Sequence, residues 1–115
     1  MPEHVRLDRE GVLLRIFIGE SDRHEGKPLY EAIMLRARER GLAGCTVLRG
    51  IAGFGAASRI HTAKILRLSM DLPIIIEIVD TPEKVRAFLD EVEPWVGGGM
   101  ATLERAEVHF YRHEP

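Results

Sequence analysis

The residues with the clearest chemistry lie in the segment RGIAGFGAASRIHT, residues 49–62, which sets bare backbone beside positive charge. Glycine lets the main chain approach a ligand closely, so that successive amide N–H groups converge on an anion, and arginine and histidine add charge. A charge-assisted hydrogen bond contributes about 1.5–3 kcal/mol, so two such bonds and several backbone amides suffice for micromolar affinity toward a phosphate group. These residue types therefore predict an anion site with phosphate as its ligand class.

Two further features bear on this anion site. No aspartate or glutamate occurs from Gly41 to Met70, although the chain contains 18 of them, so we expect a site clear of carboxylates. A second run of bare backbone, Gly97 to Gly99, could close on the same ligand. Neither the G-x-x-x-x-G-K-[ST] motif nor the G-x-G-x-x-G motif of phosphate-binding loops is present. Spacing alone leaves open that both glycine groups only form turns.

Metal binding and nucleophilic catalysis have weaker support in the sequence. His109 and His113 are four residues apart and could share a face, but no third ligand of matching geometry is evident, which favours surface roles. Ser58 and His61 are the only local pairing of a nucleophile with a base, and they stand three residues apart in a loop. Cys45 lies in an apolar strand pattern, which indicates a small buried hydrophobic residue.

Composition restricts the class of protein. The 115 residues are 45% hydrophobic and 30% charged, as expected of a single globular domain over residues 1–115. A net charge of -2 argues against a protein that coats nucleic acid. One cysteine excludes an internal disulfide and fits a reducing compartment. The longest apolar run, LPIIIEIV, is too short to span a bilayer and MPEHVRLDREG lacks a signal-peptide core, so we expect a cytoplasmic protein without membrane insertion.

Hydrophobic patterns predict the elements that position these residues. The segment VLLRIFIG alternates apolar side chains with period two, as strands do. Pro28 opens a segment with one apolar helical face, and Gly41 supplies its stop. A second helix begins at the DTPE motif and ends before Pro94. The predicted elements are strand 12–19, helix 28–40, strand 45–50, a returning segment at 63–69, strand 72–79, helix 82–93 and strand 102–111.

The main elements follow the order β-α-β-β-α-β, which predicts an α+β, ferredoxin-like fold, an antiparallel sheet with both helices on one face. If Ile74, Ile76 and Ile78 face the helices, alternate residues point to the other face. The residues expected there are Leu13, Arg15, Phe17, Ile75, Glu77 and Val79, and Arg15 could pair with Glu77. An apolar face that no helix covers indicates a homo-oligomer whose sheets face one another.

Several segments also carry a resemblance to a known family. GIAGFG resembles the V-x-G-F-G loop entry of the PII signal-transduction proteins, and LPIIIEIVD resembles their L-P-x-x-x-I-E-I-V strand with one residue fewer. The segments GESDR, GKPLYEAI, VLRGIAGFG, SRIHT and DLPIIIEIVD together resemble an uncharacterised family of PII-like proteins. This resemblance covers nearly the whole chain.

The resemblance implies a trimer of ferredoxin-like subunits that binds an adenine nucleotide (ATP, ADP or AMP, with or without Mg²⁺) in the clefts between neighbours. In such proteins the nucleotide lies between the base of the loop after the second strand and a glycine-rich turn after the second helix. The residues of the candidate nucleotide site are Arg49, Gly50, Gly53, Phe54, Gly55, Ser58, His61, Gly97, Gly98 and Gly99.

This sequence departs from the PII proteins in three places. Its loop is short and lacks their modifiable tyrosine, its glycine turn lacks the lysine that follows it there, and the terminal arginine pair is absent. Control by uridylylation and sensing of 2-oxoglutarate are therefore not expected.

The predicted function is that of a signalling protein, not an enzyme, which requires no cofactor and relays nucleotide occupancy to a protein partner through residues 55–62. The resemblance implies membrane transporters or channels among such partners, and no nucleic acid is expected. Two alternatives stay open. One is a small phosphotransfer or nucleotide-hydrolysing enzyme that uses the same cleft, and the other is a structural trimer that binds metal through its histidines.

Overall fold

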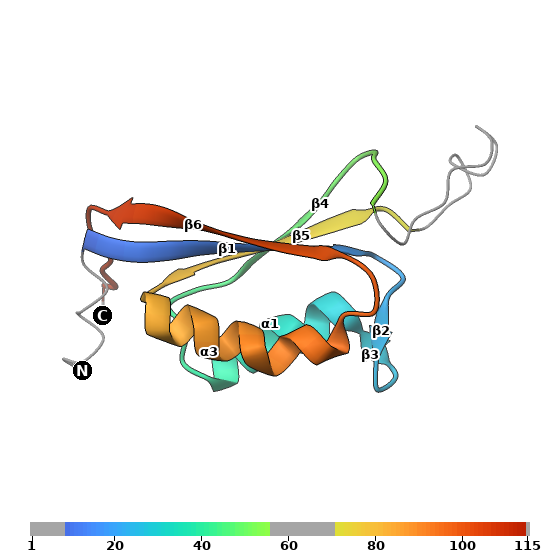
Figure 1. The fold of residues 1–115 in the computed structure, drawn as a ribbon, viewed down its shortest axis with the longest axis horizontal. Coiled ribbons are helices and arrows are strands. Elements are labelled where there is room, and N and C mark those ends of the chain that lie inside the picture. The colour runs from blue at the N-terminus through green and yellow to red at the C-terminus, as the bar shows by residue number, and fades with distance from the viewer. Residues whose placement is uncertain (1–8, 56–70, 115) are drawn as a thin grey trace.

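The computed structural model of the chain describes residues 9–55 and 71–114. Along the chain run β1 (Arg9–Gly19), β2 (Arg23–His24), β3 (Lys27–Pro28), α1 (Leu29–Glu39), β4 (Thr46–Arg49), β5 (Pro73–Asp80), α3 (Pro82–Val92), the 3-10 helix η2 (Glu93–Trp95) and β6 (Met100–Val108). The long strands form an antiparallel sheet in the order β4-β5-β1-β6, with both helices on one face (Figure 1). The predicted ferredoxin-like fold is therefore confirmed, while the predicted segment at 63–69 lies outside the described residues.

The hydrophobic core lies between the sheet and the helices. Every second residue of β1 from Val12 to Ile18 is buried, and Ile74, Ile76 and Ile78 of β5 are at most 3% exposed. Burial of one such side chain stabilises the fold by about 1.5–3 kcal/mol, so the alternating pattern fixes which face of each strand turns inward. The helices add Leu29, Ala32, Ile33, Ala37, Val85, Phe88 and Val92 to this core.

Local sequence signals set the helix ends. Pro28 stands at the N-cap of α1, and the helix stops before Gly41, whose φ of +73° suits glycine. Pro82 occupies the first turn of α3, where the side chain of Thr81 accepts a hydrogen bond from the Lys84 amide at 3.4 Å. Helix α3 then continues into η2, so that the chain reaches Gly97 with little loop.

The last strand begins and ends earlier in the sequence than the alternation predicts. The expected range was 102–111, but β6 ends at Val108, which pairs with Arg9, the first residue of β1. The Tyr111 hydroxyl donates to the Ala43 carbonyl oxygen at 2.9 Å, which directs the segment after β6 toward the loop before β4. The prediction that residues 109–111 continue the strand was wrong, since β6 ends at Val108 and Tyr111 bonds to the loop before β4.

A small hairpin, β2–β3, lies between β1 and α1. Its two central residues, Glu25 and Gly26, have φ of +51° and +83°, as a tight two-residue hairpin requires. His24 pairs with Lys27 across it. The hairpin projects beside the start of α1 (Figure 1), and the ring of His24 stacks on Trp95 of the 3-10 helix.

The face of the sheet away from the helices, here called the open face, carries the predicted apolar side chains. Those on the open face are Leu13, Phe17, Leu48, Ile75, Val79 and Met100, all half-buried or exposed. Arg15 Nε donates to Glu77 Oε2 at 2.9 Å, which confirms the predicted pair, and Arg15 Nη1 lies 3.6 Å from Glu104 Oε2. An ion pair thus stands within an apolar surface.

Candidate functional site

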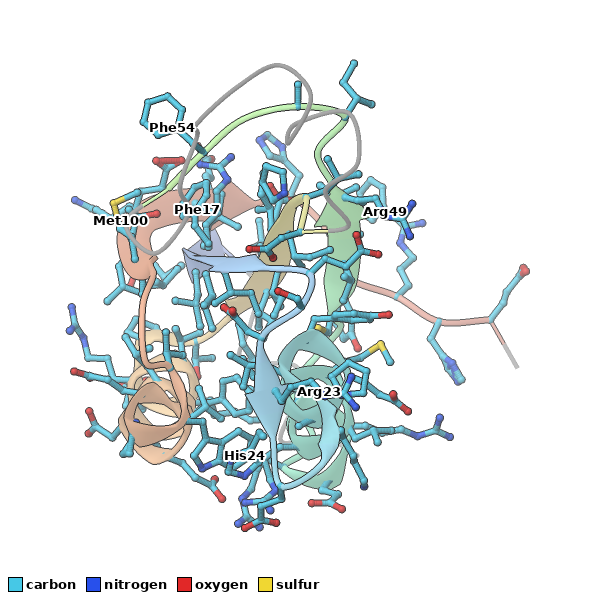
Figure 2. All side chains as sticks on the ribbon, turned by 90° about the vertical axis from the view of Figure 1, so that its right-hand side faces the viewer. Phe17, Arg23, His24, Arg49, Phe54 and Met100 are labelled. Atoms are coloured by element: carbon cyan, nitrogen blue, oxygen red, sulfur yellow. The ribbon has the colours of Figure 1, made fainter. Side chains whose placement is uncertain are left out.

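Four strand ends meet at one end of the sheet, here called the site end. β1 ends at Gly19 and β4 at Arg49, while β5 begins at Pro73 and β6 at Met100. Gly19 is opposite Pro73 and Phe17 is opposite Met100 in the ladders. Figure 2 looks onto this end, with the Phe54 and Met100 side chains on one side of the view and Arg49 on the other. Both predicted glycine groups lie here, one after the edge strand β4 and the other before the edge strand β6.

The first glycine segment, residues 50–55, leaves the sheet close to Pro73. The Gly50 amide donates to the Pro73 carbonyl oxygen at 2.7 Å. A Cβ on Gly50 would lie 3.2 Å from Pro73 Cγ, and one on Gly53 3.1 Å from it. Gly50 and Gly53 therefore allow the chain to leave β4 close to Pro73. No atom of the described residues lies within 4 Å of an added Cβ on Gly55, and Phe54 is 73% exposed.

The second group, the glycine turn of residues 97–99, walls a hollow of about 530 Å³. Ile16, Leu89, Val92, Glu93, Val96, Met100 and Ala101 complete its lining. A Cβ on Gly99 would stand 2.4 Å from the Phe17 carbonyl oxygen, so only glycine fits here. The volume falls within the range of small-molecule sites, and the lining joins bare backbone to apolar side chains.

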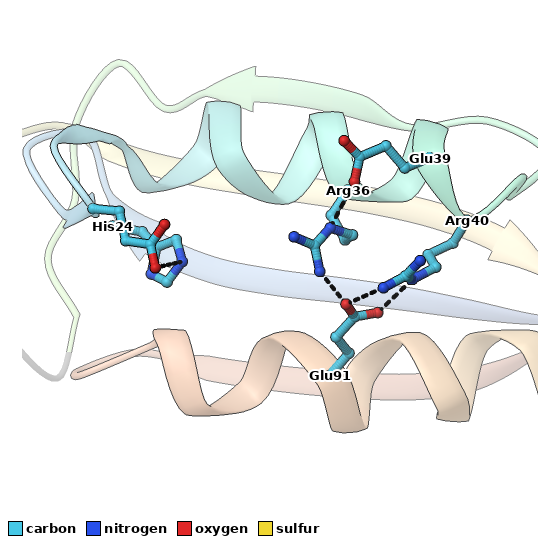
Figure 3. Close-up of polar contacts among 6 residues, drawn as sticks. His24, Arg36, Glu39, Arg40 and Glu91 are labelled. Carbon is cyan, nitrogen blue, oxygen red and sulfur yellow. Dashed lines mark hydrogen bonds and ion pairs between the residues drawn. The ribbon is translucent and has the colours of Figure 1, made fainter.

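Ring stacking and an ion-pair cluster hold the segment that leads into the glycine turn. The rings of His24 and Trp95 stack with centroids 4.2 Å apart and an interplanar angle of 14°. Arg40 donates to both oxygens of Glu91, at 2.6 and 2.8 Å, and Arg36 donates to the same carboxylate (Figure 3). Glu91 belongs to α3 and both arginines to the end of α1, so the cluster clamps the two helices together.

This cluster of Glu91 with Arg36 and Arg40, here called the helix clamp, also lowers the pKa of Glu91. Hydrogen bonds from Arg40, and then from Arg36, lower the pKa of Glu91 from its ordinary value of 4.5 to about 2. The carboxylate therefore stays ionised over the physiological range, and the clamp persists with it.

Arg49 is not free at the site end. Its Nη2 lies 2.8 Å from Oε2 of Glu20, the residue that follows β1. The site is therefore not clear of carboxylates, contrary to the expectation from residues 41–70, because Glu20 contacts Arg49. Sequence reasoning missed Glu20 because the two residues are remote in the chain, and only the strand order brings them together. Its place in the GESDR segment was the available signal.

The remaining predicted residues divide into those at the site end and those not described. Gly97, Gly98 and Gly99 share the hollow, while Arg49, Gly50, Gly53, Phe54 and Gly55 lie at the same end of the sheet without lining it. Ser58 and His61 lie outside the described residues. Burial raises the pKa of the Cys45 thiol above its ordinary value of 9.0, which leaves this group protonated and a poor nucleophile.

The described ranges contain neither a cluster of metal ligands nor a helix suited to span a membrane. No group of three or more His, Cys, Asp or Glu within residues 9–55 and 71–114 is placed to hold a metal ion. No helix in the described part of the chain is long and apolar enough to cross a membrane.

The fold is similar to that of a solved PII-like protein. That protein is CPII, a nitrogen regulatory PII-like protein from Thiomonas intermedia K12. The CPII structure with ADP and bicarbonate bound has a TM-score of 0.62 and 18% sequence identity, covering 88% of this chain and 90% of that one. The structure with ADP, AMP and bicarbonate gives 0.64 and 17% over the same shares.

The chain belongs to the DUF190 family, described as Uncharacterized ACR, COG1993, whose model matches residues 11–108. A UPF0166 protein of Aquifex aeolicus is 46% identical over 98 residues, which cover 85% of this chain and 92% of that protein. The UPF0166 protein MJ1524 of Methanocaldococcus jannaschii is 34% identical over 103 residues, covering 89% and 93%. The resemblance to an uncharacterised PII-like family is thereby confirmed.

Proposed function

We propose that this chain is a cytoplasmic regulatory protein that binds an adenine nucleotide between copies of itself and relays occupancy to a protein partner. The observation that carries the proposal is the glycine turn, whose backbone walls a hollow of about 530 Å³ at the same end of the sheet as Arg49. One CPII structure with a similar fold contains ADP, and another contains both ADP and AMP. These bound molecules support a nucleotide as the ligand class.

The chemistry of the site end suits such a ligand. The hollow offers the partly exposed apolar side chains of Leu89, Val96 and Met100 to a flat ring system. Bare amides of the glycine turn and the guanidinium of Arg49 offer hydrogen-bond donors to phosphate oxygens. ATP, ADP and AMP all combine these two features, and Mg²⁺ would accompany the more highly charged of them.

The open face provides the means of assembly. Its apolar side chains are half-buried or exposed in one copy, and an apolar face of a sheet that no helix covers marks an interface. Packing against the open faces of two further copies would bury them and would enclose Arg15 with Glu77 at the centre. We therefore propose a trimer, with nucleotide sites at its subunit boundaries.

Signal relay requires two states with different affinity for the nucleotide. In the proposed mechanism, phosphate occupancy is relayed to a partner through residues 55–62, of which residues 56–62 lie outside the described ranges. A membrane transporter or channel is one such partner. The relay is limited by the difference in nucleotide affinity between the two states.

Isothermal titration calorimetry with ATP, ADP and AMP tests the binding step directly. We expect saturable binding of at least one nucleotide in the micromolar range. Sedimentation velocity on the same preparation measures assembly, with a trimer as the expected species. If none of the three nucleotides binds at millimolar concentration, or if the protein is a monomer in dilute solution, the proposed function is wrong and only the fold assignment remains.

Incubation with ATP and Mg²⁺ separates regulation from catalysis. A regulatory protein returns the nucleotide intact, whereas a phosphotransfer or hydrolytic enzyme using the same hollow releases ADP or transfers phosphate. Chromatography of the nucleotides after prolonged incubation measures the difference. Steady release of ADP in proportion to protein concentration would replace the regulatory proposal with the enzymatic one.

A further inference from the structure

One ion pair at the site end joins strands that are not neighbours. Arg49 is opposite Ile74 of β5, and Glu20 follows Gly19, which is opposite Pro73. The contact between Arg49 Nη2 and Glu20 Oε2, 2.8 Å, therefore spans the start of β5. It connects the end of β4 to the end of β1, although β5 separates those strands in the sheet.

The carboxylate of this pair is held more firmly than the guanidinium. Glu20 has a side chain 23% exposed, against 61% for Arg49. The Glu20 amide donates to the Leu72 carbonyl oxygen at 2.8 Å, and the next amide, that of Ser21, donates to Asp71 Oδ1 at 3.0 Å. The main chain on both sides of the carboxylate is thus bonded to the segment that enters β5. Arg49, in contrast, has a long side chain that can turn toward solvent.

We propose that Glu20 is an internal competitor of the nucleotide for Arg49. This inference rests on the proposed function, because it concerns the same site. In the empty site the Glu20 carboxylate occupies the guanidinium. A phosphate group must take the guanidinium from it and leaves Glu20, three-quarters buried, without its partner.

The exchange has a physical consequence for affinity. Breaking one charge-assisted contact offsets part of the gain from the new one, and the released carboxylate repels the incoming anion. Glu20 therefore lowers affinity for every anionic ligand that engages Arg49. It also makes occupancy of the site change the end of β1, which leads into the β2–β3 hairpin.

Calorimetry with ADP and with inorganic pyrophosphate tests the competition, the second probe being independent of the adenine group. The Glu20→Gln variant keeps the shape and removes the charge. We expect it to bind both probes roughly two- to fivefold more tightly, as for loss of a partly exposed ion pair. Glu25→Gln, which removes the same charge from the neighbouring hairpin, is the matched control and should leave the affinity unchanged. Unchanged melting of each variant confirms folding.

An Arg49→Gln background separates direct competition from a general field effect. Once the guanidinium is gone, the further change Glu20→Gln should give no gain in ADP affinity. An equal gain in both backgrounds overturns the inference, because Glu20 would then act only by repulsion. Should Arg49→Gln leave no measurable binding, the Glu25→Gln control decides, since a gain equal to that of Glu20→Gln also overturns it.

The two proposals fail in different ways. If the unsubstituted protein binds ADP and Glu20→Gln binds it no better, the competition is wrong and the function stands. If no nucleotide binds but Glu20→Gln strengthens pyrophosphate binding, the nucleotide function is wrong, and Glu20 competes for Arg49 with a phosphate ligand of another kind. If neither ADP nor pyrophosphate binds either protein, both are overturned.

Discussion

The two glycine groups of the site end are built in different ways. The glycine turn presses against the sheet, where Gly99 leaves no room for a Cβ beside the Phe17 carbonyl oxygen, and Trp95 just before it stacks on His24. The first glycine segment has the opposite character. Ile51 is 96% exposed, and an added Cβ on Gly55 would meet no atom within 4 Å.

The difference indicates which half of the site exists before the ligand arrives. The glycine turn and its hollow are formed by contacts within one copy, so they need no ordering when a ligand binds. Among the described residues, the first glycine segment has few contacts beyond Pro73, and segments with few buried contacts are those that open or rearrange at low cost. The proposed relay requires such a difference between a fixed half and an exposed half.

The largest expected effect comes from breaking the fixed half. Gly99→Ala would place a Cβ 2.4 Å from a backbone oxygen at a φ of +155°, and we expect a loss of about 2–4 kcal/mol in the free energy of unfolding. Thermal or urea unfolding measures it. Gly97→Ala is the matched control, because an added Cβ there has no neighbour within 4 Å. Equal stability of the two variants would show that the turn is not fixed as described.

A smaller effect is expected from the exposed half, and in binding instead of stability. Arg49→Ala removes a charge-assisted contact to phosphate, so we expect nucleotide affinity to fall roughly tenfold. The oligomer should survive, because Arg49 is absent from the open face. Arg38→Ala, an exposed arginine on α1, removes the same charge elsewhere as a control. Calorimetry and sedimentation decide, and an affinity equal to that of the control would remove Arg49 from the site.

The same contrast explains what the sequence could predict. Alternation in β1 and β5 assigned both faces of the sheet correctly, because side-chain direction in a strand is a local property. The pair of Arg15 and Glu77 followed from this assignment, since both residues belong to the open face and lie opposite one another. The glycine turn was also predicted, because only glycine permits such a close approach.

Contacts that depend on strand order or strand length could not be predicted in this way. Glu20 reaches Arg49 only because β5 brings the ends of β1 and β4 to one place, which no local pattern encodes. The alternation that continues to Tyr111 gave no sign that β6 ends at Val108 or that Tyr111 bonds to Ala43. Residues 41–70 contain no acidic residue, but this did not reveal that Glu20, remote in the sequence, lies next to Arg49.

The smallest expected effect concerns the clamp that holds α3 and, with it, the approach to the glycine turn. The folded pKa of Glu91, about 2, is below its ordinary value of 4.5, so its contribution to stability is complete above pH 4.5 and is lost as the pH falls toward 2. We expect the melting temperature of the unsubstituted protein to fall over this window more steeply than that of Glu91→Gln, which lacks the titrating group. Glu39→Gln, which removes a single exposed contact to Arg36, is the control and should follow the unsubstituted profile. Parallel profiles for Glu91→Gln and the unsubstituted protein would mean that the clamp adds nothing, and the rigidity of the glycine turn would then rest on Gly99 and the His24–Trp95 stack alone.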